Sequence, residues 1–134
     1  MSNLLYVDDD SRRLQVLPAR LELLDHKVVT ANNGVDALEI FKHQRFDLAI
    51  VDYYMPGMGG DILALEMKKA WPNVPIIMFS GTFKMPQMVI GIADGFVSTA
   101  DGAEALIARI TEILPRRQPG RARRLQPSKT KGAA

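Results

Sequence analysis

The sequence predicts an α/β domain with a five-stranded parallel sheet, doubly wound by helices on both faces. Short apolar runs alternate with segments whose apolar residues recur at helical spacing, in the order βαβαβαβαβα. The apolar runs are nearly continuous, as expected for strands covered on both sides. Residues that favour turns separate the segments. Regular alternation of this kind is typical of a parallel sheet with helices on each face.

The apolar runs define the strands. Acidic, Gly, Pro or Asn residues bound them, as expected at strand ends. The third run, FDLAIVD, is strongly apolar and ends in Asp52. The expected strands are residues 4–7, 27–31, 46–52, 75–80 and 96–98.

The helices are inferred from apolar residues three and four positions apart. Asp10 or Ser11 is placed to cap the first helix, and Pro18 is expected to kink or loosen it. The fourth helix is short, with Pro86 at its first position. Asp101 and Glu104 form a capping box before the fifth. The expected helices contain Leu14, Leu17, Leu21 and Leu24, then Ala37, Leu38 and Phe41, then Ile62, Leu63, Leu65 and Met67, then residues 85–92, and finally Leu106, Ile110 and Ile113.

Charge divides the chain into a body and a tail. Residues 1–114 carry 10 Lys and Arg against 15 Asp and Glu, whereas residues 115–134 carry seven Lys and Arg and no acid. We interpret residues 1–114 as one domain and residues 115–134 as a basic, disordered tail with little to bury. The tail is either a solubilising end or an electrostatic arm for nucleic acid or an acidic partner.

Composition excludes several classes of protein. The chain has no cysteine, so disulfide and thiolate chemistry are excluded. No apolar run approaches the roughly 20 residues that span a bilayer. The N-terminus lacks the basic start and long apolar core of a signal peptide. We therefore expect a cytoplasmic protein without membrane contact.

Acids and hydroxyls follow the ends of the strands. Asp8 and Asp9 follow the first strand, and Asp52 ends the third. Ser80 ends the fourth strand, and Thr99 follows the fifth. In a doubly wound sheet, ligands bind beyond the carboxyl ends of the strands. We expect these side chains to gather at that edge.

Three carboxylates in one place favour a bound cation. They repel one another and would raise at least one pKa unless a hard divalent ion neutralises them. Mg²⁺ takes oxygen ligands and often bridges carboxylates to phosphate. Asp8, Asp9 and Asp52 could therefore hold Mg²⁺ while one carboxylate attacks phosphorus. Taken singly, each has a simpler interpretation, as a helix cap or as a polar residue that ends a strand.

One string of residues is specific enough to suggest a family. Asp-x-x-Met-Pro-x-Met-x-Gly runs from Asp52 to Gly60, and further matching segments are residues 4–9, 75–80 and 93–97. Over residues 3–114 the chain resembles the receiver domain of two-component response regulators. The resemblance implies a flavodoxin-like fold. It also implies that Asp52 is the phospho-acceptor.

The resemblance implies roles for the other site residues. Asp8 and Asp9 match the acidic pair of the Mg²⁺ site, with the Tyr54 backbone carbonyl as a further ligand. Ser80 matches the switch hydroxyl that bonds the phosphoryl group. Phe96 matches the switch aromatic, which swings inward when that hydroxyl moves.

The sequence departs from the family after the fifth strand. Receivers usually carry a Lys followed by Pro there, and the Lys contacts the phosphoryl group. Thr99 and Ala100 stand at these positions. Thr99 can donate one hydrogen bond but brings no charge. Lys84, four residues after Ser80, is the nearby cation by sequence, either as a substitute or as an ordinary loop lysine.

The implied function is a stand-alone receiver in a two-component or phosphorelay signalling system. It would take its phosphoryl group from a histidine kinase or histidine phosphotransfer protein and signal to a downstream protein through altered contacts. It would not be an enzyme, and at most it would catalyse its own phosphorylation and dephosphorylation. The main alternative, favoured by Thr99, is a degenerate receiver-like scaffold that works without phosphate. A phosphohydrolase would place a second Asp where Tyr54 stands, and a dinucleotide site would need glycines in the Asp-rich first loop.

Overall fold

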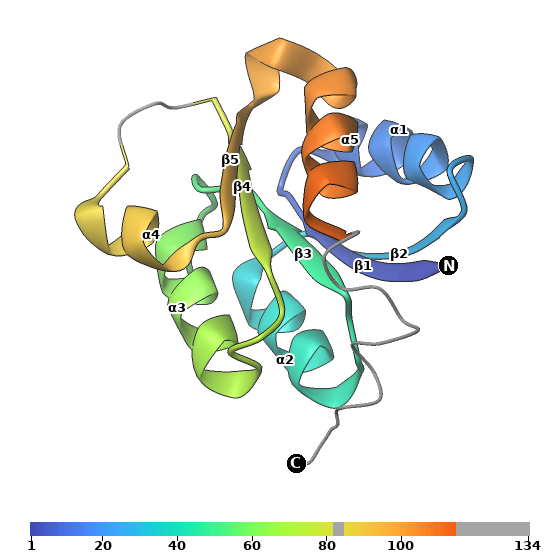
Figure 1. Ribbon diagram of the computed structural model, residues 1–134. Coiled ribbons are helices and arrows are strands. Elements are labelled where there is room, and N and C mark those ends of the chain that lie inside the picture. Colours follow the sequence, from blue (N-terminus) through green and yellow to red (C-terminus); the bar gives the residue numbers. More distant parts are fainter. Residues whose placement is uncertain (82–84, 115–134) are drawn as a thin grey trace.

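The computed structural model describes residues 1–81 and 85–114, which fold around one parallel sheet (Figure 1). In spatial order its strands are β2 (His26–Ala31), β1 (Ser2–Val7), β3 (Leu48–Val51), β4 (Ile76–Ser80) and β5 (Gly95–Ser98). Each neighbouring pair is parallel. The predicted fold class, a doubly wound five-stranded parallel sheet, is confirmed.

Helices cover both faces of the sheet (Figure 1). One face carries α1 (Ser11–Glu22) and α5 (Gly102–Ile113). The other carries α2 (Gly34–His43), α3 (Gly60–Ala70) and α4 (Gln87–Ile92). A short 3-10 helix, η1 (Thr99–Asp101), joins β5 to α5. None of the described helices has the length and apolar character needed to span a bilayer.

The strands divide their side chains between two hydrophobic clusters. In β1, Leu4 and Tyr6 enter the cluster under α1 and α5, whereas Leu5 and Val7 enter the cluster under α2, α3 and α4. All four side chains are fully buried. Successive residues of a strand point to opposite faces, so a strand covered on both sides has no position for a solvated side chain. This geometry explains the nearly continuous apolar runs.

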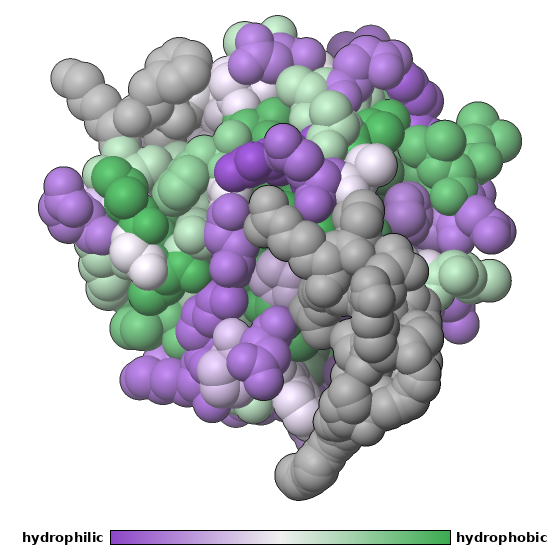
Figure 2. Space-filling model, in the orientation of Figure 1, coloured by the Kyte–Doolittle hydropathy of each residue, from purple (hydrophilic) through white to green (hydrophobic). Residues whose placement is uncertain are grey.

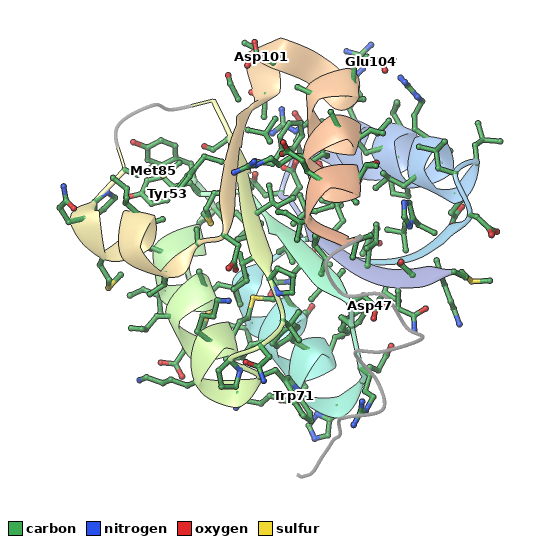
Figure 3. The ribbon with its side chains drawn as sticks, in the orientation of Figure 1. Asp47, Tyr53, Trp71, Met85, Asp101 and Glu104 are labelled. Atoms are coloured by element: carbon green, nitrogen blue, oxygen red, sulfur yellow. The ribbon has the colours of Figure 1, made fainter. Side chains whose placement is uncertain are left out.

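Pro18 does not end α1, which continues to Glu22 with Leu17 and Leu21 packed on the sheet. The expected capping box at the start of the fifth helix is wrong. Asp101 and Glu104 lie at the start of α5 (Figure 3), but Asp101 makes no side-chain cap bond. Glu104 instead accepts a bond from Arg20, at 2.7 Å. A partner on another helix replaces the capping box, which local spacing could not foresee.

Candidate functional site

The acidic residues meet at the carboxyl ends of β1 and β3. The backbone N–H of Asp52 donates to the carbonyl of Val7, which aligns the residues that follow the two strands. One carboxylate oxygen from each of Asp8, Asp9 and Asp52 lies within 4.8 Å of the other two. Asp8 is fully buried and Asp52 is 5% exposed, whereas Asp9 is exposed. The predicted gathering of these three acids at the sheet edge is confirmed.

Asp8 is surrounded by donors. Its Oδ2 accepts from the Tyr6 hydroxyl at 2.5 Å and from Arg13 Nε at 2.7 Å. Its Oδ1 accepts from the Asp10 backbone N–H at 2.9 Å and from Arg13 Nη2 at 3.2 Å. A carboxylate has about four acceptor positions. All four are therefore in use, two of them by one guanidinium.

Arg13 reaches the site from the first turn of α1. Asp10 caps this helix by accepting from the backbone N–H groups of Arg12 and Arg13. Arg13 Nη1 lies 3.4 Å from Asp10 Oδ2, and Arg13 Nη2 lies 3.8 Å from Asp52 Oδ2. Arg13 was not among the site residues expected from the sequence. The available signal was a pair of arginines, with no acid, in the first turn of a helix, where the macrodipole disfavours cations.

The neighbouring charges shift the pKa values of the site. Burial alone would raise the pKa of Asp8, but hydrogen bonds from Arg13, Tyr6 and the Asp10 backbone outweigh it and keep the pKa below its usual value. Burial and the neighbouring Asp8 raise the pKa of Asp52 to about 7, although Arg13 opposes this. The pKa of Arg13 is raised by its bond to Asp8, and burial followed by the bond to Asp8 raises the pKa of Tyr6. Asp8 therefore stays ionised, whereas Asp52 stays protonated up to about neutral pH.

The loop after β3 approaches the Asp52 backbone closely. A Cβ on Gly60 would lie 2.2 Å from the carbonyl oxygen of Asp52, so only glycine fits where α3 begins. The Gly60 N–H donates to the Tyr53 carbonyl at 2.8 Å. Tyr53 and Tyr54 pack edge to face, with ring centroids 4.8 Å apart, and Tyr54 is 65% exposed. The Tyr54 side chain thus points largely to solvent.

The remaining predicted residues lie on β4, β5 and η1. Ser80 is 2% exposed and pairs in register with Ser98. Thr99 Oγ1 lies 3.4 Å from the position that a Cβ on Gly81 would take, which places it beside the end of β4. Phe96 is 41% exposed and lines a cavity of about 710 Å³ between α4 and α5. Lys84 lies outside the described residues.

Hydrophobic residues on the face that carries β5 occur in patches separated by hydrophilic ones (Figure 2). Tyr53 and Met85, labelled in Figure 3, both pack against the cluster under α2, α3 and α4. Met85 also lines the cavity that Phe96 borders. The loop that follows Asp52 and the entry to α4 therefore pack against the same hydrophobic cluster.

Comparison with known proteins identifies the family. Residues 4–111 match the family described as response regulator receiver domain. The chain belongs to the response-regulator receiver family. This receiver is 38% identical over 119 residues to a protein named probable transcriptional regulator ycf27 from Cyanidium caldarium, a match covering 87% of this chain and 47% of the relative. The chain spans about half the length of the curated relatives it matches.

Solved receiver structures share the fold. A CheY-like receiver domain protein from Methanospirillum hungatei superposes with a TM-score of 0.83 at 25% identity, covering 87% of this chain and 95% of the other. The response regulator TrrA from Thermotoga maritima, in complex with Mg²⁺ and BeF, gives 0.80 at 28% identity over 85% and 100% of the two chains. TrrA bound to the histidine kinase ThkA gives 0.78 at 28% identity over 85% and 99%. This chain is thus a receiver domain with an acidic pocket.

The acidic pocket of this receiver fits a hard divalent ion. Octahedral Mg²⁺ has oxygen ligands at about 2.1 Å, which places those ligands roughly 3 to 4 Å apart. The three carboxylates need only a small contraction from 4.8 Å to meet this requirement. Burial and then the neighbouring Asp8 raise the pKa of Asp52, and Arg13 offsets them only in part, so a bound cation would favour the ionised carboxylate. The four hydrogen bonds to Asp8 set one condition for ion binding. One of the four donors must move away before an Asp8 oxygen can coordinate the ion.

Proposed function

We propose that this receiver accepts a phosphoryl group on Asp52 and signals through altered protein contacts. The observation that carries the proposal is the gathering of Asp52 with Asp8 and Asp9 at the carboxyl edge of the sheet, in a chain of the receiver family. Asp52 would attack phosphorus through a carboxylate oxygen. The new oxygen–phosphorus bond forms as the bond from phosphorus to the donor nitrogen breaks, and that nitrogen keeps the electron pair and takes a proton from water.

Asp8, Asp9, Asp52 and the Tyr54 backbone carbonyl would hold Mg²⁺. When bound, the ion would neutralise charge on the phosphoryl oxygens. Asp8 is suited to this task because its hydrogen bonds keep it ionised. Asp9, which is exposed, offers its carboxylate from the solvent side. The TrrA complex with Mg²⁺ and BeF supports the same ion for this chain.

Ser80 and Phe96 would couple phosphorylation to the surface. Ser80 is buried at the end of β4, where its hydroxyl could turn towards a group on Asp52. Phe96 lies partly exposed beside the cavity between α4 and α5, so inward movement would change the surface there. The structure of TrrA with ThkA supports a histidine kinase, or a histidine phosphotransfer protein, as the phosphodonor. The downstream partner would be a protein that distinguishes the two states of Phe96.

The second candidate is a scaffold that works without phosphate. Two observations favour it. Thr99 brings no charge to the site, and Arg13 already neutralises part of the acidic cluster. Phosphorylation and scaffolding differ in one measurable property, which is whether Asp52 can be modified.

The test is phosphorylation by a small donor. The protein is incubated with phosphoramidate or acetyl phosphate and Mg²⁺, and intact mass is followed over time. We expect one phosphoryl group on the parent protein and none on Asp52→Asn. Glu22→Gln, which alters an exposed acid at the C-terminal end of α1, should behave like the parent. Absence of the adduct at all times would favour the scaffold.

A further inference from the structure

Thr99 leaves the proposed phosphorylation site without the positive charge that receivers usually place after the fifth strand. A hydroxyl can donate one hydrogen bond. It cannot neutralise the oxygens of a phosphoryl group, and bonds from charged donors are roughly twice as strong as neutral ones. Positive charge must come from elsewhere on the chain if the transfer is to be efficient. The structure offers a candidate on the opposite side of the pocket.

We propose that Arg13 is the basic residue of this site and supplies, from the first turn of α1, the charge that Thr99 lacks. The inference rests on the proposed phosphorylation of Asp52. Among the described Lys and Arg side chains, Arg13 alone has a nitrogen within 4 Å of an Asp52 oxygen, with Nη2 at 3.8 Å from Oδ2. No family motif in the sequence pointed to this residue.

The contacts of Arg13 give it a second property, which is competition with Mg²⁺. Its Nε and Nη2 take one position on each oxygen of Asp8, whose other two positions belong to Tyr6 and the Asp10 backbone. An ion that coordinates Asp8 must displace one of these donors. The Asp10 bond is part of the turn into α1, and Tyr6 is fully buried. Arg13 is 33% exposed in its side chain, so it is the donor with room to leave.

A displaced Arg13 has a suitable new acceptor. Its guanidinium presents a planar fork of N–H donors that suits carboxylate and phosphate oxygens alike. The side chain already faces Asp52, where the phosphoryl oxygens would appear. Arg13 therefore exchanges one anionic partner for another. A purely structural ion pair with Asp8 would predict no effect on phosphorylation once Mg²⁺ is saturating.

The test separates Mg²⁺ binding from the rate of phosphorylation. Arg13→Gln removes the charge, and Arg12→Gln is the matched control because it removes an equal charge one residue away. Arg12 is exposed, and in the described part of the chain its side chain makes no ion pair. Mg²⁺ affinity is measured by tyrosine fluorescence without a phosphodonor. The rate is then measured with phosphoramidate at saturating Mg²⁺.

Arg13→Gln is expected to bind Mg²⁺ about tenfold more tightly and to be phosphorylated about tenfold more slowly, as expected for loss of charged hydrogen bonds. Arg12→Gln should change neither value by more than about twofold. Adding Thr99→Lys to Arg13→Gln should restore much of the rate, because it returns a cation from the other side. Arg13→Lys keeps the charge, so it should retain most of the rate even if Arg13→Gln folds poorly.

Two results would overturn the inference. One is an Arg13→Gln protein that is phosphorylated at least as fast as Arg12→Gln at saturating Mg²⁺. The other is an unchanged Mg²⁺ affinity in Arg13→Gln. If the parent itself takes no phosphoryl group, the proposed function fails and this inference fails with it. If the parent is phosphorylated and only the Arg13 effect is missing, the proposed function stands and the role of Arg13 is refuted.

Discussion

Replacing Asp52 by Asn should make the stability of the domain less dependent on pH. In the folded protein the pKa of Asp52 is raised to about 7, first by burial and then by Asp8. In the unfolded chain an Asp titrates near 3.8. The folded state therefore binds the proton more tightly than the unfolded state does. Stability from this group is full below about pH 4, falls as pH rises, and is lost above about pH 7.

The size of the effect follows from the difference of about three pKa units. Each unit corresponds to about 1.4 kcal/mol, so ionising Asp52 in the folded protein costs about 4 kcal/mol in the free energy of unfolding. Little of this is lost to solvent screening because Asp52 is 5% exposed. Asn keeps the shape of the neutral acid and never ionises. At pH 8 the Asn variant should be more stable than the parent by up to about 4 kcal/mol, and at pH 4 the two should be equal.

Urea unfolding in EDTA at pH 4, 6 and 8 measures this difference directly. Asp101→Asn is the control, since that side chain is exposed and makes no helix-cap bond. Repeating the pH 8 measurement with Mg²⁺ should shrink the gap, because the ion would stabilise the ionised parent. A gap between Asp52→Asn and the parent that stays constant from pH 4 to 8, or has the opposite sign, would refute the reasoning.

Three further predictions concern other parts of the chain. Gly60→Ala should lower the free energy of unfolding by about 3 kcal/mol or more and slow phosphorylation, because its Cβ would lie 2.2 Å from the Asp52 carbonyl oxygen. The control Gly91→Ala, whose Cβ would meet nothing within 4 Å, should not lower the melting temperature. Deleting residues 116–134 should leave the melting temperature unchanged, since both hydrophobic clusters lie within residues 4–114. If the deletion abolishes binding to duplex nucleic acid, the parent's log affinity should fall with log salt concentration with a slope of about −6. Thr99→Lys should enlarge the phosphodonor-induced amide shifts around Ser80 and Phe96, and no enlargement would mean that the switch is already complete.

The sequence by itself determined the fold class and the acidic cluster. The central strands β3 and β4 are buried on both faces, so their apolar character is visible in short local runs. The carboxyl ends of parallel strands lie at one edge, so the order of elements was enough to bring Asp8 and Asp52 together. The motif from Asp52 to Gly60 resembles that of receiver domains, and the structure explains its last residue, since a Cβ on Gly60 would clash with the Asp52 carbonyl oxygen.

The tertiary structure alone decided which charges meet. Arg20 and Glu104 are 84 positions apart, and their ion pair replaced the capping box that local spacing predicted. Arg13 was overlooked because its role depends on the direction of a long side chain from α1 towards the buried Asp8. The raised pKa of Asp52 likewise depends on burial and on that neighbour. Periodicity along a chain is set by local geometry, whereas electrostatic energies depend on distance and burial, which exist only after packing has placed the side chains.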